Sequence, residues 1–298
     1  MAASPARAYG ECHDFFCDVS CDLPMSQPSA HIGQSASLTV GSLLRDWRQR
    51  RRLSQLALAT EADVSQRHLS FVESGRAAPS REMLLRLAEP LQLPLRERNR
   101  LLMAGGYAPV YGEHDLYHPD AEAARRVVEM VLAGHAPYPA LAVDRYWQLV
   151  MANPPALALL GNIAPSLLVP PVNVLRASLH PEGLASRVVN YREWRAHVLT
   201  RLAQQVDQSG DPVLAALAEE LRALSVPANA LPRSPRQHAD YAGLAIPLEL
   251  ATDDGVLRLI STVTVFGTPI DAGVAELAIE SFFPADPETA ARLQALAP

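Results

Sequence analysis

The chain has 298 residues, enough for about two domains that each bury a hydrophobic core. All 26 basic residues are Arg, because the sequence contains no Lys. The absence of Lys excludes enzymes that need a Schiff-base Lys, a P-loop Lys or a Ser-x-x-Lys acylation centre. The net charge of −6 argues against a chain built entirely around nucleic acid.

The charge is unevenly distributed along the chain. Residues 41–101 contain 12 Arg and 7 acidic residues, a net charge of +5, whereas the remainder contains 14 Arg and 25 acidic residues, a net charge of −11. A basic segment within an acidic chain indicates one module that faces phosphate and another that faces something else.

No segment of the sequence is typical of a membrane protein. The longest uncharged stretch, between Arg145 and Arg176, is interrupted by five prolines and cannot form an apolar helix of about 20 residues. The first residues carry acidic groups where a signal peptide needs an apolar run. We therefore expect a soluble, cytoplasmic protein without a membrane partner.

Residues 1–38 are polar and aperiodic, and we predict a disordered N-terminal arm. The arm contains Cys12, His13, Cys17 and Cys21, a set that could bind a metal or act in redox chemistry, but it lacks the paired Cys-x2-Cys of most zinc sites. Two alternatives are an unstructured tail and a segment that is not translated, in which case Met25 would be the first residue.

Residues 39–106 predict a compact all-α module of five helices. Apolar residues recur at helical spacing, and Thr39, Ser54 and Ser65 stand where they would cap the first three helices. The side chains expected to face the core are Val40, Leu43, Leu44, Trp47, Leu56, Ala59, Leu69, Val72, Met83, Leu84, Leu87 and Leu91.

Residues 107–135 are predicted to be a linker followed by a connecting helix over 120–134. Its inner face is expected to carry Ala124, Val127, Val128 and Val131.

Residues 136–298 predict an α+β domain around an antiparallel sheet. Period-two patterns predict strands at 141–143, 149–151, 244–250 and 256–266, the last two joined by a turn at 252–255. Helices are predicted at 155–160, at 187–206, after Pro212 and in a last segment that carries Val274, Leu277 and Phe282.

The segment 54–75 has the pattern of a helix-turn-helix: two short helices, a three-residue connection and a polar outer face on the second helix. A helix of this size fits the DNA major groove, where Gln and Arg can bond adenine and guanine. An all-α dimerisation or partner-binding module is the alternative, and Glu73 is expected to be structural. The candidate DNA contacts are Gln55, Ser65, Gln66, Arg67, His68, Ser70, Phe71, Arg76 and Arg81.

This segment resembles the XRE (Cro/C1) type of helix-turn-helix. The motifs are Leu56-Ala57, Val64-Ser65, Leu69, Glu73-x-Gly75, Pro79-Ser80 and Leu84-x2-Leu87-Ala88. The resemblance implies that residues matching Gln55, Ser65, Gln66, Arg67 and Phe71 meet DNA, and that the position of Arg81 can enter the minor groove. Phe71 stands where a polar side chain is common, so it touches a thymine methyl or packs.

The remainder resembles the MmyB-like (MltR-type) bacterial transcription regulators, which join this helix-turn-helix to a PAS-like ligand-binding domain. The motifs include Val143-Asp144-Arg145, Met151-Ala152-Asn153, Gly105-Gly106-Tyr107-Ala108-Pro109, Leu179-His180-Pro181, Asn190-Tyr191-x2-Trp194-Arg195 and Phe282-Phe283-Pro284-Ala285-Asp286. The resemblance implies a fatty-acyl-like or other apolar ligand. Candidate ligand contacts are Trp147, Asn153, His180, Tyr191, Trp194, Thr264 and Phe266.

Each of these candidates has an alternative role in capping a loop or filling the core, and the sequence does not fix which strand face would line a pocket. The predicted function is therefore a dimeric regulator that binds double-stranded operator DNA and senses a small apolar ligand. The alternative is a DNA-binding protein whose second domain is a protein-interaction or dimerisation scaffold without a ligand.

The sequence predicts no enzyme, cofactor or metal site. His180-Pro181-Glu182 matches half of a zinc-deaminase motif, but no cysteine follows residue 21. His114 and His118 stand four residues apart beside Asp115 and Asp120, where a solvated loop is the favoured interpretation.

Overall fold

The computed structural model describes residues 39–231, 245–266 and 271–295. The predictions for the arm with Cys12, Cys17 and Cys21, for Leu244 and for the break at 267–269 lie outside the described residues. Among the helices that are described, none combines the length and the hydrophobicity needed to cross a membrane.

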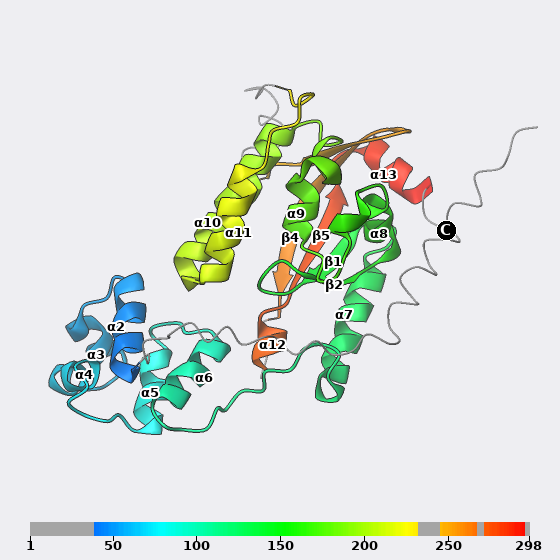
Figure 1. The fold of residues 1–298 in the computed structure, drawn as a ribbon. Coiled ribbons are helices and arrows are strands. Elements are labelled where there is room, and N and C mark those ends of the chain that lie inside the picture. The colour runs from blue at the N-terminus through cyan, green and yellow to red at the C-terminus, as the bar shows by residue number, and fades with distance from the viewer. Residues whose placement is uncertain (1–38, 232–244, 267–270, 296–298) are drawn as a thin grey trace, which may run out of the picture. The chain divides into compact units, whose positions relative to one another are not determined.

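The first part of the described chain is a bundle of short helices (Figure 1). Their bounds are α2 Val40–Arg50, α3 Gln55–Glu61, α4 Gln66–Glu73, α5 Arg81–Ala88 and α6 Leu95–Ala104. Four of them begin at a hydroxyl side chain that accepts a backbone N–H of the first turn, as predicted for the first three. These caps are Thr39, Ser54, Ser65 and Ser80.

All the side chains predicted to face the core of this bundle are buried except one, and the core also contains apolar residues that were not predicted. Leu56 is 59% exposed, whereas Leu58 and Ala59 are buried. Because a helix turns about 100° per residue, Leu58, Ala59 and Ala62 form one stripe and Leu56 lies well outside it. The prediction that Leu56 faces inward is wrong.

The second part contains a five-stranded antiparallel sheet (Figure 1). Its strands are β1 Ala140–Val143, β2 Leu149–Ala152, β3 Leu248–Thr252, β4 Gly255–Val265 and β5 Ala278–Pro284. Their order is β2-β1-β5-β4-β3, so the last strand in sequence lies in the middle. The architecture of a helical domain followed by a PAS-like α+β domain is confirmed.

The prediction of one helix that carries Val274, Leu277 and Phe282 is wrong. Only Ala272–Ala275 (α12) is helical before β5, which bonds β1 on one edge and β4 on the other. Pairing on both edges outweighs a local pattern that can be read as helical. Leu277 and Phe282 are buried as expected, whereas Val274 is only partly buried.

Helices cover both faces of the sheet, because side chains of a strand alternate between faces. Leu141 and Val143 of β1 join the larger apolar core, whereas Ala140 and Ala142 pack in a smaller one. The larger core also receives α8 Pro154–Leu160, α9 Val174–Leu179, α10 Tyr191–Ser209, α11 Pro212–Ala223 and α13 Pro287–Ala295, and the smaller core receives α7 Glu122–Gly134.

Two helices differ from their predicted form. The inner stripe of α7 contains Val128 and Leu132, whereas Val127 and Val131 are exposed. Helix α10 begins at Tyr191 rather than near residue 187, because the preceding residues run beside β3 and bond its backbone.

Candidate nucleic-acid interface and ligand-binding core

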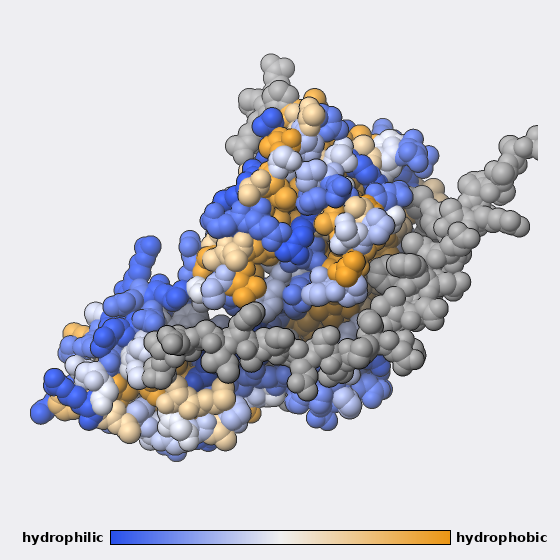
Figure 2. Space-filling model, viewed as in Figure 1, coloured by the Kyte–Doolittle hydropathy of each residue, from blue (hydrophilic) through white to orange (hydrophobic). Residues whose placement is uncertain are grey.

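Helix α4 presents polar side chains at its N-terminal end. Gln66, Arg67 and His68 are exposed, whereas Leu69 and Val72 are buried in the helical core. The surface over α2, α3 and α4 is largely hydrophilic (Figure 2). The buried pair holds the helix on the domain and leaves three consecutive polar side chains facing solvent.

Ser65 and Phe71, two of the candidate DNA contacts, interact with other residues of this helix. The Oγ of Ser65 accepts the backbone N–H of His68 at 3.1 Å and fixes the helix start. Ser70 and Phe71 are half-buried, and the guanidinium carbon of Arg67 lies 5.4 Å from the centroid of the Phe71 ring. Phe71 therefore supports the side chain of Arg67 by a cation–π contact.

Glu73, at the end of α4, is buried in a network that joins three helices. Arg48 of α2 donates from Nε to Oε1 at 2.7 Å and from Nη2 to Oε2 at 2.9 Å. Gln55 of α3 donates from Nε2 to Oε2 at 2.9 Å, and Arg45 donates to the Glu73 carbonyl oxygen at 2.9 Å. The structural role predicted for Glu73 is confirmed.

The network keeps the Glu73 carboxylate charged. Burial alone would raise the pKa of Glu73, but hydrogen bonds from Arg48 and Gln55 and the charges of Arg48 and Arg45 hold that pKa below its ordinary value. Gln55, a candidate DNA contact, thus donates one N–H to Glu73 and retains a second N–H on the same nitrogen.

The other basic candidates flank the start of the next helix. Gly75 has φ +73°, a left-handed conformation that favours glycine and turns the chain after α4. Arg76 follows directly and Arg81 is the first residue of α5; both side chains are exposed. The structure therefore places both of them at loop–helix boundaries next to α4.

The aromatic ligand candidates lie in the larger core, and their polar atoms bond protein groups. Trp147 donates from Nε1 to Gln205 at 2.8 Å, and Trp194 donates from Nε1 to Ser178 at 2.8 Å. Tyr191 is fully buried and its hydroxyl donates to a carbonyl oxygen at 3.1 Å. Burial raises the pKa of Tyr191, so the phenol stays neutral.

Asn153 and His180 cap turns. Asn153 accepts backbone N–H groups of Ala156 and Ala140 and donates to the carbonyl oxygens of Leu132 and Tyr138. His180 accepts a backbone N–H two residues later through Nδ1 at 3.1 Å. The structure gives both side chains the capping role that the sequence left as an alternative.

The strand candidates lie on the other face of the sheet. Leu257 and Leu259 of β4 join the larger core, so Thr264 and Phe266, at positions of opposite parity, face the other way. Phe266 packs against the smaller core beside α7, and Thr264 is exposed. The structure therefore does not bring these two residues together with the aromatic candidates.

Comparisons with known proteins agree with the two-part architecture. Residues 44–98 match the helix-turn-helix family, and residues 124–296 match the ligand-binding domain of MmyB-like transcription regulators. The chain belongs to the MmyB-like transcription regulators. It is therefore a DNA-binding transcription regulator with a ligand-binding domain, and both matched domains are regulator domains rather than enzyme domains.

The other comparisons add little to the MmyB-like assignment. No curated protein matches the chain. A solved structure described as an RNA-binding Light-Oxygen-Voltage receptor is similar over 99% of this chain and 68% of that chain, with 13% identity and a TM-score of 0.25. This likeness is too weak to carry an argument.

In this MmyB-like regulator, two polar residues of α10 that are not among the predicted contacts, Arg201 and Gln205, contact the side chain of Trp147. The guanidinium carbon of Arg201 lies 5.0 Å from the centroid of the Trp147 ring, and Arg201 donates to Glu280 of β5 at 3.0 Å. The spacing of Arg201 and Gln205 predicts that they share one side of α10. The contact with Glu280 does not follow from the sequence, because the local pattern around Glu280 predicts a helix rather than strand β5.

Trp147 itself has an unusual backbone. Its φ of +64° lies in the left-handed region, which a bulky side chain rarely adopts. Such a conformation costs about 1–3 kcal/mol and persists only where the surroundings fix it. The backbone N–H of Trp147 donates to the carbonyl oxygen of Asp144 and its carbonyl oxygen accepts the N–H of Val174, while Gln205 and Arg201 contact the indole ring.

Proposed function

We propose that this regulator binds operator DNA as a dimer, with α4 of each copy in the major groove. The observation that carries the proposal is the run Gln66-Arg67-His68, exposed at the start of a helix whose inner face is buried. Dimers of this kind meet half-sites about 34 Å apart.

The proposed roles follow from side-chain chemistry and position. Gln66 and Arg67 read base edges, since Gln bonds adenine and Arg bonds guanine bidentately. The remaining contacts position the domain on phosphate or sugar, with Arg81 near the minor groove. Phe71 supports the side chain of Arg67 through the cation–π contact. The positioning group comprises Gln55, Ser65, His68, Ser70, Arg76 and Arg81.

We infer that the second domain binds a small apolar molecule of the fatty-acyl type on the sheet face covered by α10 and α11. The strained Trp147, stacked on Arg201 and packed in the larger core, supports this face over the one covered by α7. Arg201 pairs with Glu280 through Nη1 and keeps further N–H groups with which an acyl carboxylate would bond. Trp194 and Tyr191 supply aromatic surface in the same core.

Ion pairs of Glu276 support a coupling between ligand binding in this domain and the DNA-binding helices. Arg96 of α6 donates to Glu276, directly after α12, at 3.0 Å, and Glu276 also pairs with Arg145 of the β1–β2 turn at 3.3 Å. A ligand changes DNA binding only if it favours one arrangement of the two domains over another.

A second candidate is a scaffold domain that binds no small molecule. The internal hydrogen bonds of Trp147, Tyr191 and Trp194 favour it, because those polar atoms are already satisfied. Native mass spectrometry of the protein from its host distinguishes the two. A co-purified acyl molecule, identified after denaturation, supports the sensor; an empty protein whose DNA affinity no fatty acid alters supports the scaffold.

The operator is found by selection from random DNA with the full-length protein, followed by fluorescence anisotropy on the selected sequence. Two symmetric half-sites about one helical turn apart are expected. Binding that does not distinguish the selected sequence from random DNA would contradict the proposed function.

A further inference from the structure

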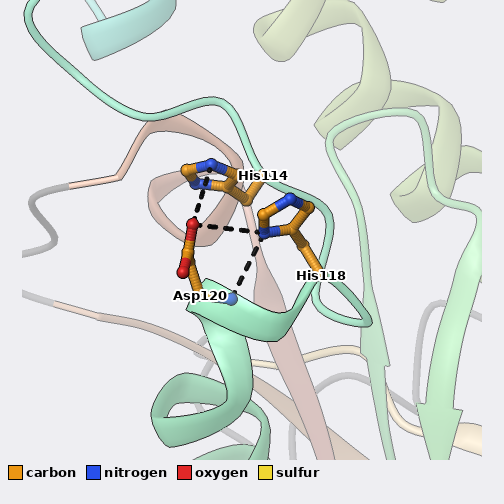
Figure 3. Close-up of side chains that lie close together, drawn as sticks. All are labelled: His114, His118 and Asp120. Atoms are coloured by element: carbon orange, nitrogen blue, oxygen red, sulfur yellow. Dashed lines mark hydrogen bonds and ion pairs between the residues drawn. The ribbon is translucent and has the colours of Figure 1, made fainter.

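Two histidines and a carboxylate converge in the segment between α6 and α7 (Figure 3). His114, His118 and Asp120 each turn one ligand-capable atom toward the others, and these atoms all lie within 4.8 Å. The segment is solvent-accessible, as the sequence predicts, since the Asp120 side chain is 74% exposed. The convergence itself was not expected.

The separations are close to those of two ligand atoms that share one metal ion. The Nε2 of His114 lies 3.8 Å from Asp120 Oδ2, and the Nδ1 of His118 lies 3.6 Å from the same oxygen. A tetrahedral Zn²⁺ with ligands at about 2.0–2.1 Å keeps two ligand atoms about 3.4 Å apart. The observed distances exceed those of a direct hydrogen bond, which are about 2.7–3.2 Å.

The hydrogen bond to Asp271 orients His114 for metal binding. Nδ1 lies 2.8 Å from Oδ2 of Asp271, and a carboxylate only accepts, so Nδ1 carries the hydrogen. In the neutral ring the lone pair is then on Nε2, the atom that faces Asp120. This carboxylate–histidine arrangement is the usual outer support of a metal-binding histidine.

The supporting carboxylate is itself fixed. Asp271 also accepts the backbone N–H groups of Gly273 and Val274 at the start of α12. The backbone N–H of Ala272 donates to the Gly112 carbonyl oxygen at 2.6 Å, which ties the two segments together. His114 is therefore held between two anchored stretches of chain.

His118 also has a ring nitrogen without a hydrogen near Asp120. Its Nδ1 accepts the backbone N–H of Asp120 at 3.2 Å, so this nitrogen carries no hydrogen. His114 Nε2 and His118 Nδ1 thus both lie within 4 Å of one carboxylate oxygen. A metal ion bound here would take the place of the Asp120 N–H at the single lone pair of His118 Nδ1.

We propose that His114 Nε2, His118 Nδ1 and Asp120 bind a first-row divalent metal ion of the Zn²⁺ type. Imidazole and carboxylate ligands in this ratio suit Zn²⁺, Co²⁺ and Ni²⁺. Three protein ligands leave a fourth position for water, and the exposed setting lets the ion exchange. Bound metal would fix the 114–120 segment against Asp271 and the start of α12.

The test is a Co²⁺ titration of the full-length, untagged protein in which Cys12, Cys17 and Cys21 are replaced by Ser. This background removes thiolates that would compete for the ion. We expect one equivalent of Co²⁺ with visible absorption typical of low coordination number, displaced by Zn²⁺. His118→Ala and Asp120→Asn should each weaken binding by more than about 10-fold, and Asp271→Asn by about 10- to 100-fold.

The matched control is Asp115→Asn, which removes a neighbouring carboxylate that bonds Tyr117 N–H outside the cluster. It should bind Co²⁺ like the background protein. Failure of the background protein to bind one equivalent, or unchanged binding by His118→Ala and Asp120→Asn, overturns the proposal. Because both of these side chains are exposed, circular dichroism should show native folding in either variant.

Discussion

Arg48 and Glu73 form a two-pronged ion pair that fastens α2 to the last residue of α4. The Glu73 side chain has no solvent exposure and that of Arg48 has only 13%. Gln55 completes the set from α3, so three helices share one carboxylate. The orientation of α4, and of its exposed N-terminal residues, therefore depends on a single buried charge.

Replacing Glu73 by Gln should lower the free energy of unfolding of the helical domain by about 3 kcal/mol. The substitution leaves the Arg48 charge buried without its partner, which is far costlier than losing an exposed pair. Urea unfolding followed by circular dichroism measures the loss. Glu61→Gln, at an exposed position of α3, is the control and should change stability by less than about 0.5 kcal/mol. Equal stability of the two variants would contradict a structural role for the pair.

The same pair predicts a pH dependence. Because the folded pKa of Glu73 is lowered, its contribution to stability is present above the unfolded pKa, about 4.3, and is lost as the pH falls through the folded pKa. The stability difference between the wild type and Glu73→Gln should therefore be constant near neutral pH and shrink below about pH 4. Urea midpoints across this range measure it, and a pH-independent difference would show that the carboxylate is not charged in the fold.

Asn153 should prove structural rather than ligand-binding. Asn153→Ala removes the cap of α8 and leaves backbone groups of the β1 region unsatisfied, a loss of about 2–3 kcal/mol. Asn153→Asp should cost at least as much, because it turns a carboxylate oxygen toward the carbonyl oxygens of Leu132 and Tyr138. Thermal unfolding, with the exposed Asn162→Ala as control, tests both. Native stability of Asn153→Ala would reopen the ligand role.

The sequence predicts most accurately those structural features that depend on residues adjacent in the chain. Thr39, Ser54 and Ser65 mark helix starts because a cap and its helix are adjacent. The central strand β5 escapes prediction because its partners lie far away in sequence, and the local pattern is compatible with a helix. The contact of Arg201 with Glu280 depends on that strand and was therefore also missed.

The candidate sites show the same division. The exposed face of α4 follows from helical periodicity within eight residues, so its polar candidates are found from the sequence. The ligand candidates belong to motifs that are scattered over the second domain. Strand alternation places Thr264 and Phe266 on the face of the sheet opposite the core that contains Trp147. Which residues meet across a sheet depends on register and on the covering helices.

Arg67→Ala and Arg76→Ala should weaken DNA binding in different ways. If Arg67 bonds a base edge, its loss costs about 1–3 kcal/mol on the selected operator and relaxes preference at one base pair. If Arg76 contacts phosphate, its loss weakens binding about equally on all sequences and lowers the slope of log affinity against log salt by about 1.

Fluorescence anisotropy on the operator and its single-base variants, at several salt concentrations, separates the two effects. Arg126→Ala, at an exposed position of α7 outside the helix-turn-helix, is the control and should leave both affinity and salt slope unchanged. An Arg67→Ala protein that keeps every base preference would remove Arg67 from the reading set. In that case its stacking on Phe71 is structural, and Gln66 is the remaining bidentate base reader on the exposed face of α4.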